Sequence, residues 1–478
     1  MYRRTSLLLL LALVLSAGCD DDGGGSDAGA TTDAGSMEDA TPGDSAVPTN
    51  TIVDIAAANP DFSMLVAAAT RADLVAALSG PGPFTVFAPT NEAFAASGIT
   101  MEAIESMPTA DLIGILTYHA VAGNVTSGDL EAGPVDTLAD LSILVGLDGG
   151  VTINGGNAVT GGADVTMPDI TADNGVIHVI DRVLLPPTVA DLARYAGLTE
   201  LHDAVVAAGL ADALNGEGPF TVFAPTNEAF PDTAPANLED ILRYHVVSGA
   251  VPSTAIPGTA QTLSTVSYES GGTTRDVALT LLFDTTSGVA INGGSGTGAS
   301  NLGANVVVAD VKATNGIVHV IDGVLLPLSI TEIALAGGFG SLVAAVGASD
   351  PIPASIAGSD TPVLDALSGT DLAPLTVFAP TDAAFAAAFP SGLPSDGAAI
   401  LGVLALHVVA APLPVRAEDI GATPVGPLAG SDLTFDTTGA SPTVTVSGGG
   451  TTAQIVGTDI GATNGIVHVI DGVLLEGS

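Results

Sequence analysis

Pro83–Phe94 reads PFTVFAPTNEAF, and this stretch decides the organisation of the chain because it recurs. Pro219–Phe230 repeats it without a change, and Leu375–Phe385 gives the variant LTVFAPTDAAF. Two further blocks follow each copy in a fixed order, a His-centred block and a closing block that begins with Asn-Gly. The His-centred blocks are Tyr118-His119-Ala120-Val121, Tyr244-His245-Val246-Val247 and Leu406-His407-Val408-Val409; the closing blocks are NGVIHVIDRVLLP from Asn174, NGIVHVIDGVLLP from Asn315 and NGIVHVIDGVLLEGS from Asn464.

The spacing of the closing blocks indicates tandem domains. They begin at residues 174, 315 and 464, whereas the repeats of a solenoid are only about 20 to 50 residues long. A chain of 478 residues also has room for about three domains of ordinary size.

The three ordered blocks resemble the fasciclin-like domain family over about residues 50–478. The resemblance implies an α+β fold in which a wedge of two β-sheets carries a bundle of short helices. It also implies cell-surface or extracellular adhesion rather than catalysis. In animal members the Tyr-His segment has been implicated in receptor binding, and the third copy departs from it because Leu406 replaces the tyrosine. We expect fasciclin-like domains at 51–187, 188–327 and 328–478.

The N-terminus predicts export and a lipid anchor. Arg3 and Arg4 precede an apolar run from Leu7 to Leu15, which is typical of a secretory signal peptide (1–18). The segment that ends it, Leu15-Ser16-Ala17-Gly18-Cys19, resembles the lipobox of bacterial lipoproteins, and Cys19 is the only cysteine of the chain. An ordinary signal peptide with a chance cysteine is the alternative. Residues 19–50 are rich in Asp, Gly, Ala, Ser and Thr, which predicts an acidic tether that does not fold.

Charge and composition exclude several partners. With 52 acidic and 9 basic residues the net charge is −43, and Lys312 is the only lysine, so nucleic acid is ruled out because phosphate binding needs clustered cations. The absence of Trp argues against sugar stacking. The 47% hydrophobic content predicts that most of the chain folds. No cofactor is expected. Calcium is the one cofactor that the acidic composition favours, but the sequence has no loop of regularly spaced Asp or Asn residues that would bind it.

Apolar periodicity places helices before strands in each copy, as the α+β class requires. Residues 62–78 predict a helix in two pieces, and the second copy repeats the pattern from Leu198 to Leu214. Residues 85–87, 151–154 and 176–185 predict strands, with Asn174-Gly175 as a tight turn before the last. The uncharged stretch 398–415 could suggest a membrane span, but its counterparts in the other copies carry charges, so a buried core is favoured.

The copies differ in two insertions. The third copy carries about twelve extra residues around 349–362, counted against the other two copies. The second is longer by about fifteen between its Tyr-His block and its Asn-Gly turn. The second insertion predicts a hairpin tip, and we treat Tyr268, Glu269 and Arg275 as a candidate specificity loop because Tyr and Arg are enriched at binding hot spots. An idle hairpin extension is the alternative.

The repeated histidines and aspartates are the candidate site residues. A metal site on the closing strand is disfavoured because residues three apart, such as His178 and Asp181, face opposite sides of a strand. We interpret the motif residues as structural or as interaction residues. They are Tyr118, His119, His178, Asp181, Tyr244, His245, His319, Asp322, His407, His468 and Asp471.

No catalytic pattern stands out. The expected folded part has no thiol, no Gly-x-Ser-x-Gly elbow and no phosphate loop. The sequence therefore predicts a non-catalytic adhesion or binding protein, secreted and anchored by lipid to a bacterial cell envelope, whose partner is an envelope or extracellular protein or a matrix ligand. A soluble-ligand or matrix-polymer binder and an acid-pair hydrolase are the alternatives.

Overall fold

The computed structural model describes residues 50–477 except 160, 232–234, 236, 294–302, 350, 352–362, 369–373, 422 and 440. The expected signal peptide, Cys19 and all of the expected tether but Asn50 lie outside the described residues. So does most of the insertion expected around 349–362.

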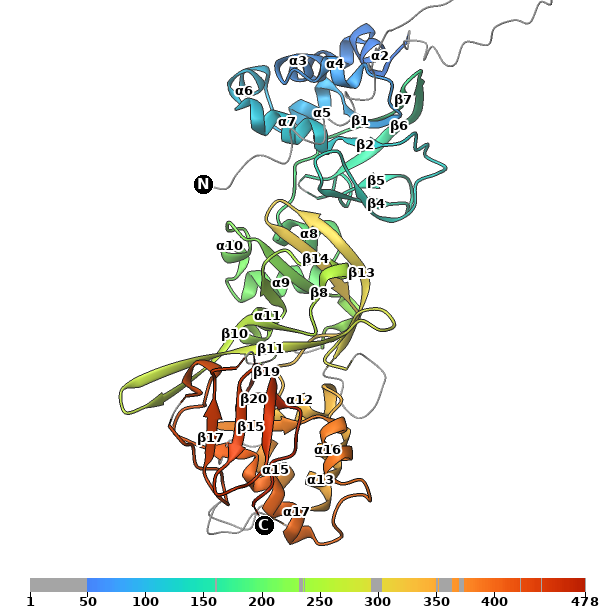
Figure 1. Cartoon of the computed structure of the whole chain (residues 1–478). Helices are drawn as coiled ribbons and strands as arrows, with labels where there is room; N and C mark the ends of the chain where they lie inside the picture. The colour runs from blue at the N-terminus through green and yellow to red at the C-terminus, as the bar shows by residue number, and fades with distance from the viewer. Residues whose placement is uncertain are drawn as a thin grey trace, which may run out of the picture. The chain divides into compact units, whose positions relative to one another are not determined.

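The first domain places a group of short helices before and around its first two strands and then forms a sheet (Figure 1). The sheet order is β2-β1-β7-β6-β5-β4-β3. The helices are α2 (Ile52–Ala58), η1 (Pro60–Phe62), α3 (Ser63–Arg71), α4 (Val75–Leu78), α5 (Asn91–Ala96), α6 (Met101–Ser106) and α7 (Thr109–Tyr118). The strands are β1 (Phe84–Pro89), β2 (Ala120–Ala122), β3 (Gly133–Asp136), β4 (Ser142–Gly146), β5 (Thr152–Ile153), β6 (Ala163–Ala172) and β7 (Gly175–Ile180).

The second domain repeats this order but closes its strands into a barrel, because Thr262 of the long strand β10 pairs with Val247 of β9. The helices are α8 (Val189–Tyr195), α9 (Thr199–Ala207), α10 (Ala211–Leu214), η2 (Asn227–Ala229), α11 (Leu238–Tyr244) and η3 (Ser253–Ala255). The strands are β8 (Phe220–Pro225), β9 (Val246–Ser248), β10 (Thr259–Ser270), β11 (Thr273–Asp284), β12 (Ala290–Ile291), β13 (Ala304–Ala313) and β14 (Gly316–Ile321).

The third domain has a six-stranded sheet in the order β16-β15-β20-β19-β18-β17. Its described helices are α12 (Ile330–Ala336), α13 (Gly340–Ala348), α15 (Val363–Ser368), α16 (Asp382–Ala388), α17 (Gly397–Leu406) and η4 (Ala417–Asp419). The strands are β15 (Leu375–Pro380), β16 (Val408–Ala410), β17 (Leu433–Asp436), β18 (Thr443–Val446), β19 (Thr452–Ala462) and β20 (Gly465–Ile470).

The TVFAP block and the closing block are hydrogen-bonded neighbours in every domain. β1 runs parallel to β7, with Val86 opposite Ile177, and the same pairing joins β8 to β14 and β15 to β20. The long strand β6 pairs with β7 along one half and with β5 at its start, so it joins the two halves of the wedge. Each domain has one core cluster between helices and sheet and a second one inside the wedge.

Most of the expected elements are present, and two differ in detail. The expected helix in two pieces over 62–78 is confirmed as α3 and α4, which are separated at Asp73 with φ 57°. The expected strand 151–154 keeps only Thr152–Ile153. The expected strand 176–185 ends at Ile180, because beyond it the Leu184 N–H donates to a histidine ring instead of a neighbouring strand.

The Asn-Gly pair also acts differently from a simple turn. The turn itself is Asp173-Asn174, and Gly175 is the first residue of β7, opposite Ala172. Gly175 has φ 153°, and a Cβ there would collide with the Phe84 carbonyl oxygen of β1. Glycine is therefore required by the close approach of two parallel strands.

Candidate functional site

The His119, His245 and His407 side chains lie at the C-terminal ends of α7, α11 and α17, where they are at most 2% exposed. Nδ1 of His119 contacts the Ile115 carbonyl oxygen at 2.8 Å, and Nε2 accepts the Leu184 N–H at 2.9 Å. The acceptor role of Nε2 leaves the proton on Nδ1, which donates to Ile115. His245 and His407 repeat both contacts in their own domains.

Burial keeps these three rings neutral. It lowers the pKa of His119, His245 and His407 to about 4, because a charged imidazolium loses its hydration inside the domain. With both ring nitrogens engaged, each ring ties the end of a helix to the segment after the closing strand.

The second histidine of each domain lies in the closing strand and contacts a different set of groups. Nε2 of His178 donates to the Val125 carbonyl oxygen at 2.9 Å, and Nδ1 accepts the Asp169 N–H at 3.3 Å. Its ring centroid lies 5.4 Å from that of Phe87 in β1. His319 and His468 repeat this arrangement with Phe223 and Phe378. Burial lowers the pKa of His319 and His468.

The motif aspartates do not join these histidines. Asp181 accepts the Asp164 N–H at 2.8 Å and the Asn157 side-chain amide at 3.0 Å. Asp322 binds Asn305 and Asp471 binds the Gln454 N–H, so each aspartate ties the closing strand to the start of the strand before it. Within the described part of the chain, no group of three or more His, Cys, Asp or Glu residues could hold a metal ion.

The two motif tyrosines are fully buried. The hydroxyl of Tyr118 donates to the Ser142 carbonyl oxygen at 3.0 Å and accepts from the Asn154 amide at 2.9 Å. Tyr244 makes the same contacts with Thr280 and Asn292, and burial raises the pKa of both phenols. These contacts support the structural interpretation of the Tyr-His block, while a role in binding stays a prediction.

Sequence reasoning missed the asparagine of the closing block. Asn174 is 2% exposed, and its amide donates to the Leu78 and Gly80 carbonyl oxygens while its Oδ1 accepts the Ile52 N–H. Asn315 makes the same three contacts with Leu214, Gly216 and Val189. The signal was present, since the asparagine recurs in all three copies, but the Asn-Gly pair pointed to a turn.

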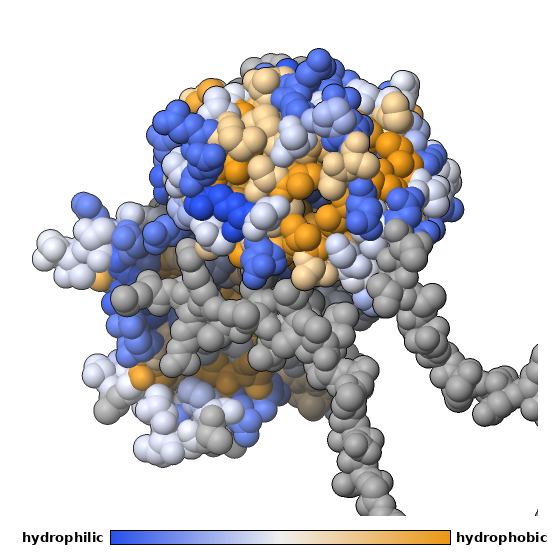
Figure 2. All heavy atoms as spheres, turned by 90° about the horizontal axis from the view of Figure 1, so that it is seen from above, coloured by the Kyte–Doolittle hydropathy of each residue, from blue (hydrophilic) through white to orange (hydrophobic). Residues whose placement is uncertain are grey.

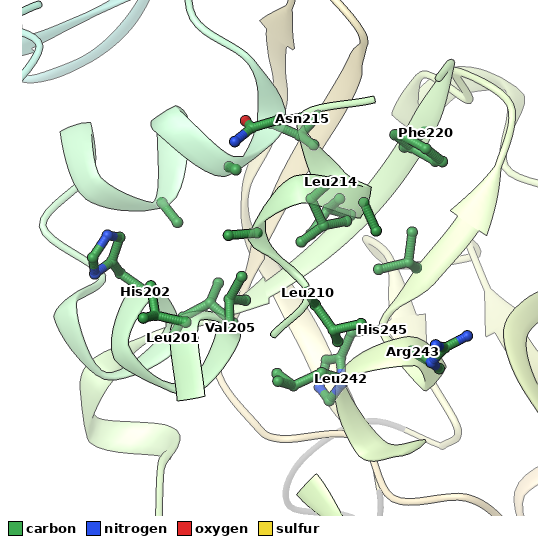
Figure 3. Close-up of a pocket in the computed structure, with 18 of the residues that line it drawn as sticks. Leu201, His202, Val205, Leu210, Leu214, Asn215, Phe220, Leu242, Arg243 and His245 are labelled. Atoms are coloured by element: carbon green, nitrogen blue, oxygen red, sulfur yellow. The ribbon is translucent and has the colours of Figure 1, made fainter. Parts of the chain in front are cut away.

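A pocket of about 290 Å³ lies in the second domain, between the helices α8 to α11 and β8 (Figure 3). Leu201, Val205, Leu210 and Leu242 line it with apolar surface. The polar groups around it include His202 and Arg243, and Arg243 is paired with Glu239 at 2.7 Å. The equivalent cavity in the third domain measures only about 30 Å³. The arrangement could hold a small apolar ligand, and sequence patterns gave no sign of it.

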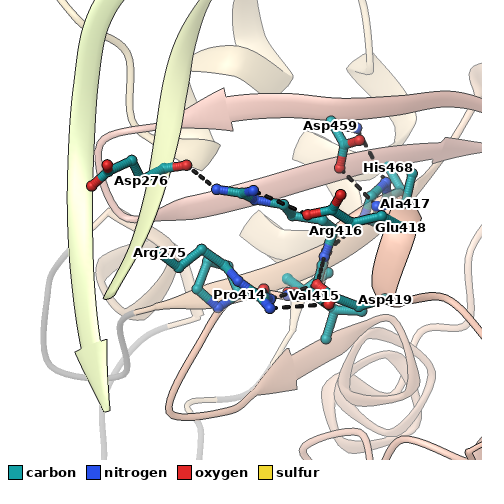
Figure 4. A network of polar contacts seen from close by, with 11 residues as sticks. Arg275, Asp276, Pro414, Val415, Arg416, Ala417, Glu418, Asp419, Asp459 and His468 are labelled. Atoms are coloured by element: carbon teal, nitrogen blue, oxygen red, sulfur yellow. Dashed lines mark hydrogen bonds and ion pairs between the residues drawn. The ribbon is translucent and has the colours of Figure 1, made fainter. Parts of the chain in front are cut away.

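The candidate specificity loop is a hairpin, β10–β11, that contacts the third domain (Figure 4). Arg275 pairs with Asp419 through two contacts of 2.5 and 3.0 Å and also donates to the Pro414 carbonyl oxygen. The Tyr268 hydroxyl donates to the Thr463 carbonyl oxygen at 3.3 Å, and Glu269 is opposite Thr274 in the hairpin. A role in binding an outside partner stays a prediction.

The described residues contain no single helix that is long and apolar enough to cross a membrane. One bent pair, Ile52–Ala58 with Pro60–Arg71, meets the criterion by length and composition only. The uncharged stretch 398–415 forms α17 and β16 of the third domain.

Comparison with known proteins gives the same family in all three domains. The model of the Fasciclin domain family matches residues 60–186, 196–327 and 356–476. The protein sll1483 of Synechocystis sp. is 49% identical over 140 residues, which is 29% of this chain and 74% of that protein. Human periostin is 36% identical over 188 residues, 38% of this chain and 22% of periostin.

One solved structure that matches is the FAS1 domain pair from the insect cell adhesion molecule Fasciclin I. The two sequences are 18% identical, and the match covers 58% of this chain and 97% of the domain pair, with a TM-score of 0.34.

Proposed function

This chain belongs to the fasciclin-domain family, and we propose on that basis that it is a non-catalytic adhesion or binding protein of a bacterial cell envelope. A lipid on Cys19 anchors it, and the acidic segment 19–50 carries the three domains away from the lipid surface. The partner is an envelope or extracellular protein or a matrix ligand.

The use of the repeated histidines is the observation that carries the non-catalytic part of the proposal. A general base or a metal ligand needs a ring nitrogen that can reach the substrate or ion. In each of the six motif histidines both ring nitrogens contact groups of the domain itself. The residues that recur in every copy therefore build the scaffold, which leaves binding to the surfaces.

The outer face of the first domain supports an adhesive role. Figure 2, a view from above Figure 1, shows hydrophobic surface over the helices of this domain, interrupted and bordered by hydrophilic side chains. Half-buried Met64 and Val66 of α3 and Leu78 of α4 contribute apolar surface. Apolar surface within a polar border is typical of a protein-binding face.

Two linked measurements test the proposal. In the first, Cys19→Ser moves the protein from the membrane fraction to the soluble fraction, since it removes the only acylation site. Detergent-dependent partitioning that persists in this variant would rule out the lipid anchor.

In the second, beads coated with the released Cys19→Ser protein adhere to cells or matrix of the source organism. Met64→Asp together with Val66→Asp reduces adhesion, and Met101→Asp, on the exposed side of α6, is the matched control. Adhesion equal to that of uncoated beads would contradict an adhesive role.

The pocket of the second domain favours a second function, the binding of a small apolar ligand. Its lining is largely apolar, and the equivalent cavity of the third domain is about a tenth as large. Titration with a fluorescent fatty-acid probe should saturate at one site per chain and weaken in Ala211→Leu, which fills the pocket. Val343→Leu at the third-domain cavity is the control. Equal probe binding in both variants would contradict this function.

A further inference from the structure

One strand position is equivalent in all three domains and can be identified from the pairing of the strands. The backbone N–H of Asn154 donates to the Leu144 carbonyl oxygen at 2.7 Å, and that of Asn292 donates to Leu282 at 2.8 Å. In the third domain the strand register gives the equivalent position, because Phe435 lies opposite Val444 as Val145 lies opposite Ile153 and Phe283 opposite Ile291. Leu144, Leu282 and Thr434 therefore occupy the same position, and Ser142, Thr280 and Asp432 precede it by two residues.

The hydroxyl residues of this strand bind the next domain in the same way. Ser142 Oγ accepts the backbone N–H of Lys312 at 3.0 Å, and Thr280 Oγ1 accepts that of Gly461 at 2.9 Å. Lys312 and Gly461 are themselves equivalent, since each lies three residues before the asparagine of its closing block. The two junctions thus share one hydrogen bond in one register.

The leucines of the same strand enter the core of the next domain. Leu144 of the first domain packs against the cluster of Val189, Tyr195 and Val311 in the second. Leu282 of the second domain is 8% exposed and belongs to the core cluster of the third. Since successive residues of a strand face opposite sides, a hydroxyl at i and a leucine at i+2 present one face to the neighbour.

The charged contacts around this face are not shared between the junctions. Lys312 Nζ binds Asp136 and Asp140 of the first domain at 2.8 Å each. At the second junction the charged pair is Arg275 with Asp419, and it comes from the hairpin (Figure 4). Only the hydroxyl and the leucine recur, so they define the docking pair: Ser142 with Leu144, and Thr280 with Leu282.

The third domain lacks the docking pair. The exposed, charged Asp432 replaces the hydroxyl residue, and Thr434 replaces the leucine. An exposed carboxylate cannot be covered by a neighbouring domain without a large loss of hydration. Thr434 also lacks the apolar side chain that enters the next core at the other two junctions.

We infer that the docking pair is a domain-to-domain binding surface whose partner is the closing hairpin of another fasciclin domain, and that the third domain is closed to such a partner. The docking pairs thereby fix the order of the three domains. An unfilled docking surface would invite a further copy, and a polar face at this position prevents that.

Inter-domain distances in the full chain test this inference. Nitroxide labels are placed on cysteines introduced at exposed positions, one per domain, in the Cys19→Ser background. Glu105→Cys with Asp203→Cys reports on the first junction, and Asp203→Cys with Ala387→Cys on the second. Pulsed EPR should give one narrow distance distribution for each pair.

The docking-pair variants should act locally. Leu144→Asp should broaden the first distribution about two-fold or more and leave the second unchanged, and Leu282→Asp should do the reverse, because domains without a packed interface move independently. Asp432→Ala is the matched control and should change neither. Where an aspartate variant loses its circular dichroism signal, Ser142→Ala and Thr280→Val, which remove only the hydroxyl, should still broaden their own junction.

Three results would overturn the inference. The first is a narrow distribution in every folded docking-pair variant. The second is broadening at both junctions from one substitution. The third is self-association of the unlabelled Cys19→Ser chain that rises with concentration in sedimentation velocity and is abolished by Asp432→Arg, since the third domain would then be open to a partner.

Discussion

In the first domain the hairpin β3–β4 has strands of four and five residues, whereas its counterpart β10–β11 in the second domain has two strands of twelve. The interiors of the two domains are nevertheless the same, contact by contact, around His119 and His245. The additional hairpin residues carry Tyr268 and Arg275 to the third domain. An insertion into a shared scaffold has thus enlarged one junction without altering the core beneath it.

The largest expected effect tests whether the interiors are equivalent in their response to acid. The pKa of His119, His245 and His407 is lowered from 6.5 to about 4 in the folded state, so the unfolded chain takes up the protons first as pH falls. Stability is therefore full above about pH 6.5 and decreases between pH 6.5 and 4, by about 3 kcal/mol for each histidine.

Urea unfolding between pH 7.5 and 4.0 measures this loss. Lowered carboxylate pKa values, such as that of Asp310, act in a separate window, because their stabilisation is lost only below about pH 3.8. Stability that stays constant from pH 7.5 to 4.5 would show that the three rings are not buried as neutral groups.

The next effect tests the same equivalence by substitution. His119→Ala and His245→Ala should each lower the free energy of unfolding of their own domain by about 1–3 kcal/mol, since a buried N–H and a carbonyl oxygen lose their partner. His178→Ala should act similarly. His202→Ala, on a partly exposed side chain, should stay within about 0.5 kcal/mol. Unequal losses at His119 and His245 would show that the interiors of the two domains are not equivalent. A zinc-dependent rise in melting temperature that vanishes in His119→Ala or His178→Ala would indicate a metal site.

A smaller effect is expected from shortening the β10–β11 hairpin, which tests whether this hairpin contributes to binding or to the stability of the second domain. Replacing residues 266–278 by a turn of first-domain length should leave the melting temperature of the second domain nearly unchanged, because all the removed side chains except Val277 are exposed or half-buried and trimming a surface hairpin costs little. The second junction should loosen in part, since Thr280 and Leu282 remain. Binding to cells that falls while the EPR distances hold would support the specificity-loop hypothesis, and unfolding of the second domain would show that the hairpin is part of its core.

The smallest effect compares the two charged pairs. Lys312→Ala and Arg275→Ala should each weaken their junction by at most about 1 kcal/mol, as expected for partly exposed ion pairs. The contribution of Lys312 should fall more with added salt, because its side chain is 31% exposed against 19% for Arg275. Arg243→Ala, whose ion pair lies within α11, is the control. A larger salt dependence at Arg275 would reverse this ranking.

The sequence predicted the family, the three domains and the helix-then-strand order because the TVFAP, His-centred and closing blocks recur in register. It also located the second-domain hairpin. It did not predict the role of Asn174, since an Asn-Gly pair is also a turn signal and its partners Leu78 and Ile52 lie about a hundred residues away. Asp169, Asp310 and Asp459 recur five residues before that asparagine, yet their contacts with the closing-strand histidines depend on β-bulges that periodicity does not show.

The docking pair escaped sequence reasoning for a related reason. Loops of different length separate Ser142, Thr280 and Asp432 from the blocks that align, so their equivalence emerges only from the strand pairing in three dimensions. The role of Arg275 likewise depends on a neighbour in another domain, which no pattern within one repeat contains.

Lys312 is the only lysine of the chain, so it marks a single site for lysine-specific chemistry. A lysine-specific protease has one peptide bond to cut in this chain, and that bond lies inside β13, a strand that the first domain touches. The folded protein should resist the enzyme, and each opening of β13 should yield the same two fragments. A gel with three bands would then report, without any label, how often the junction between the first two domains comes apart.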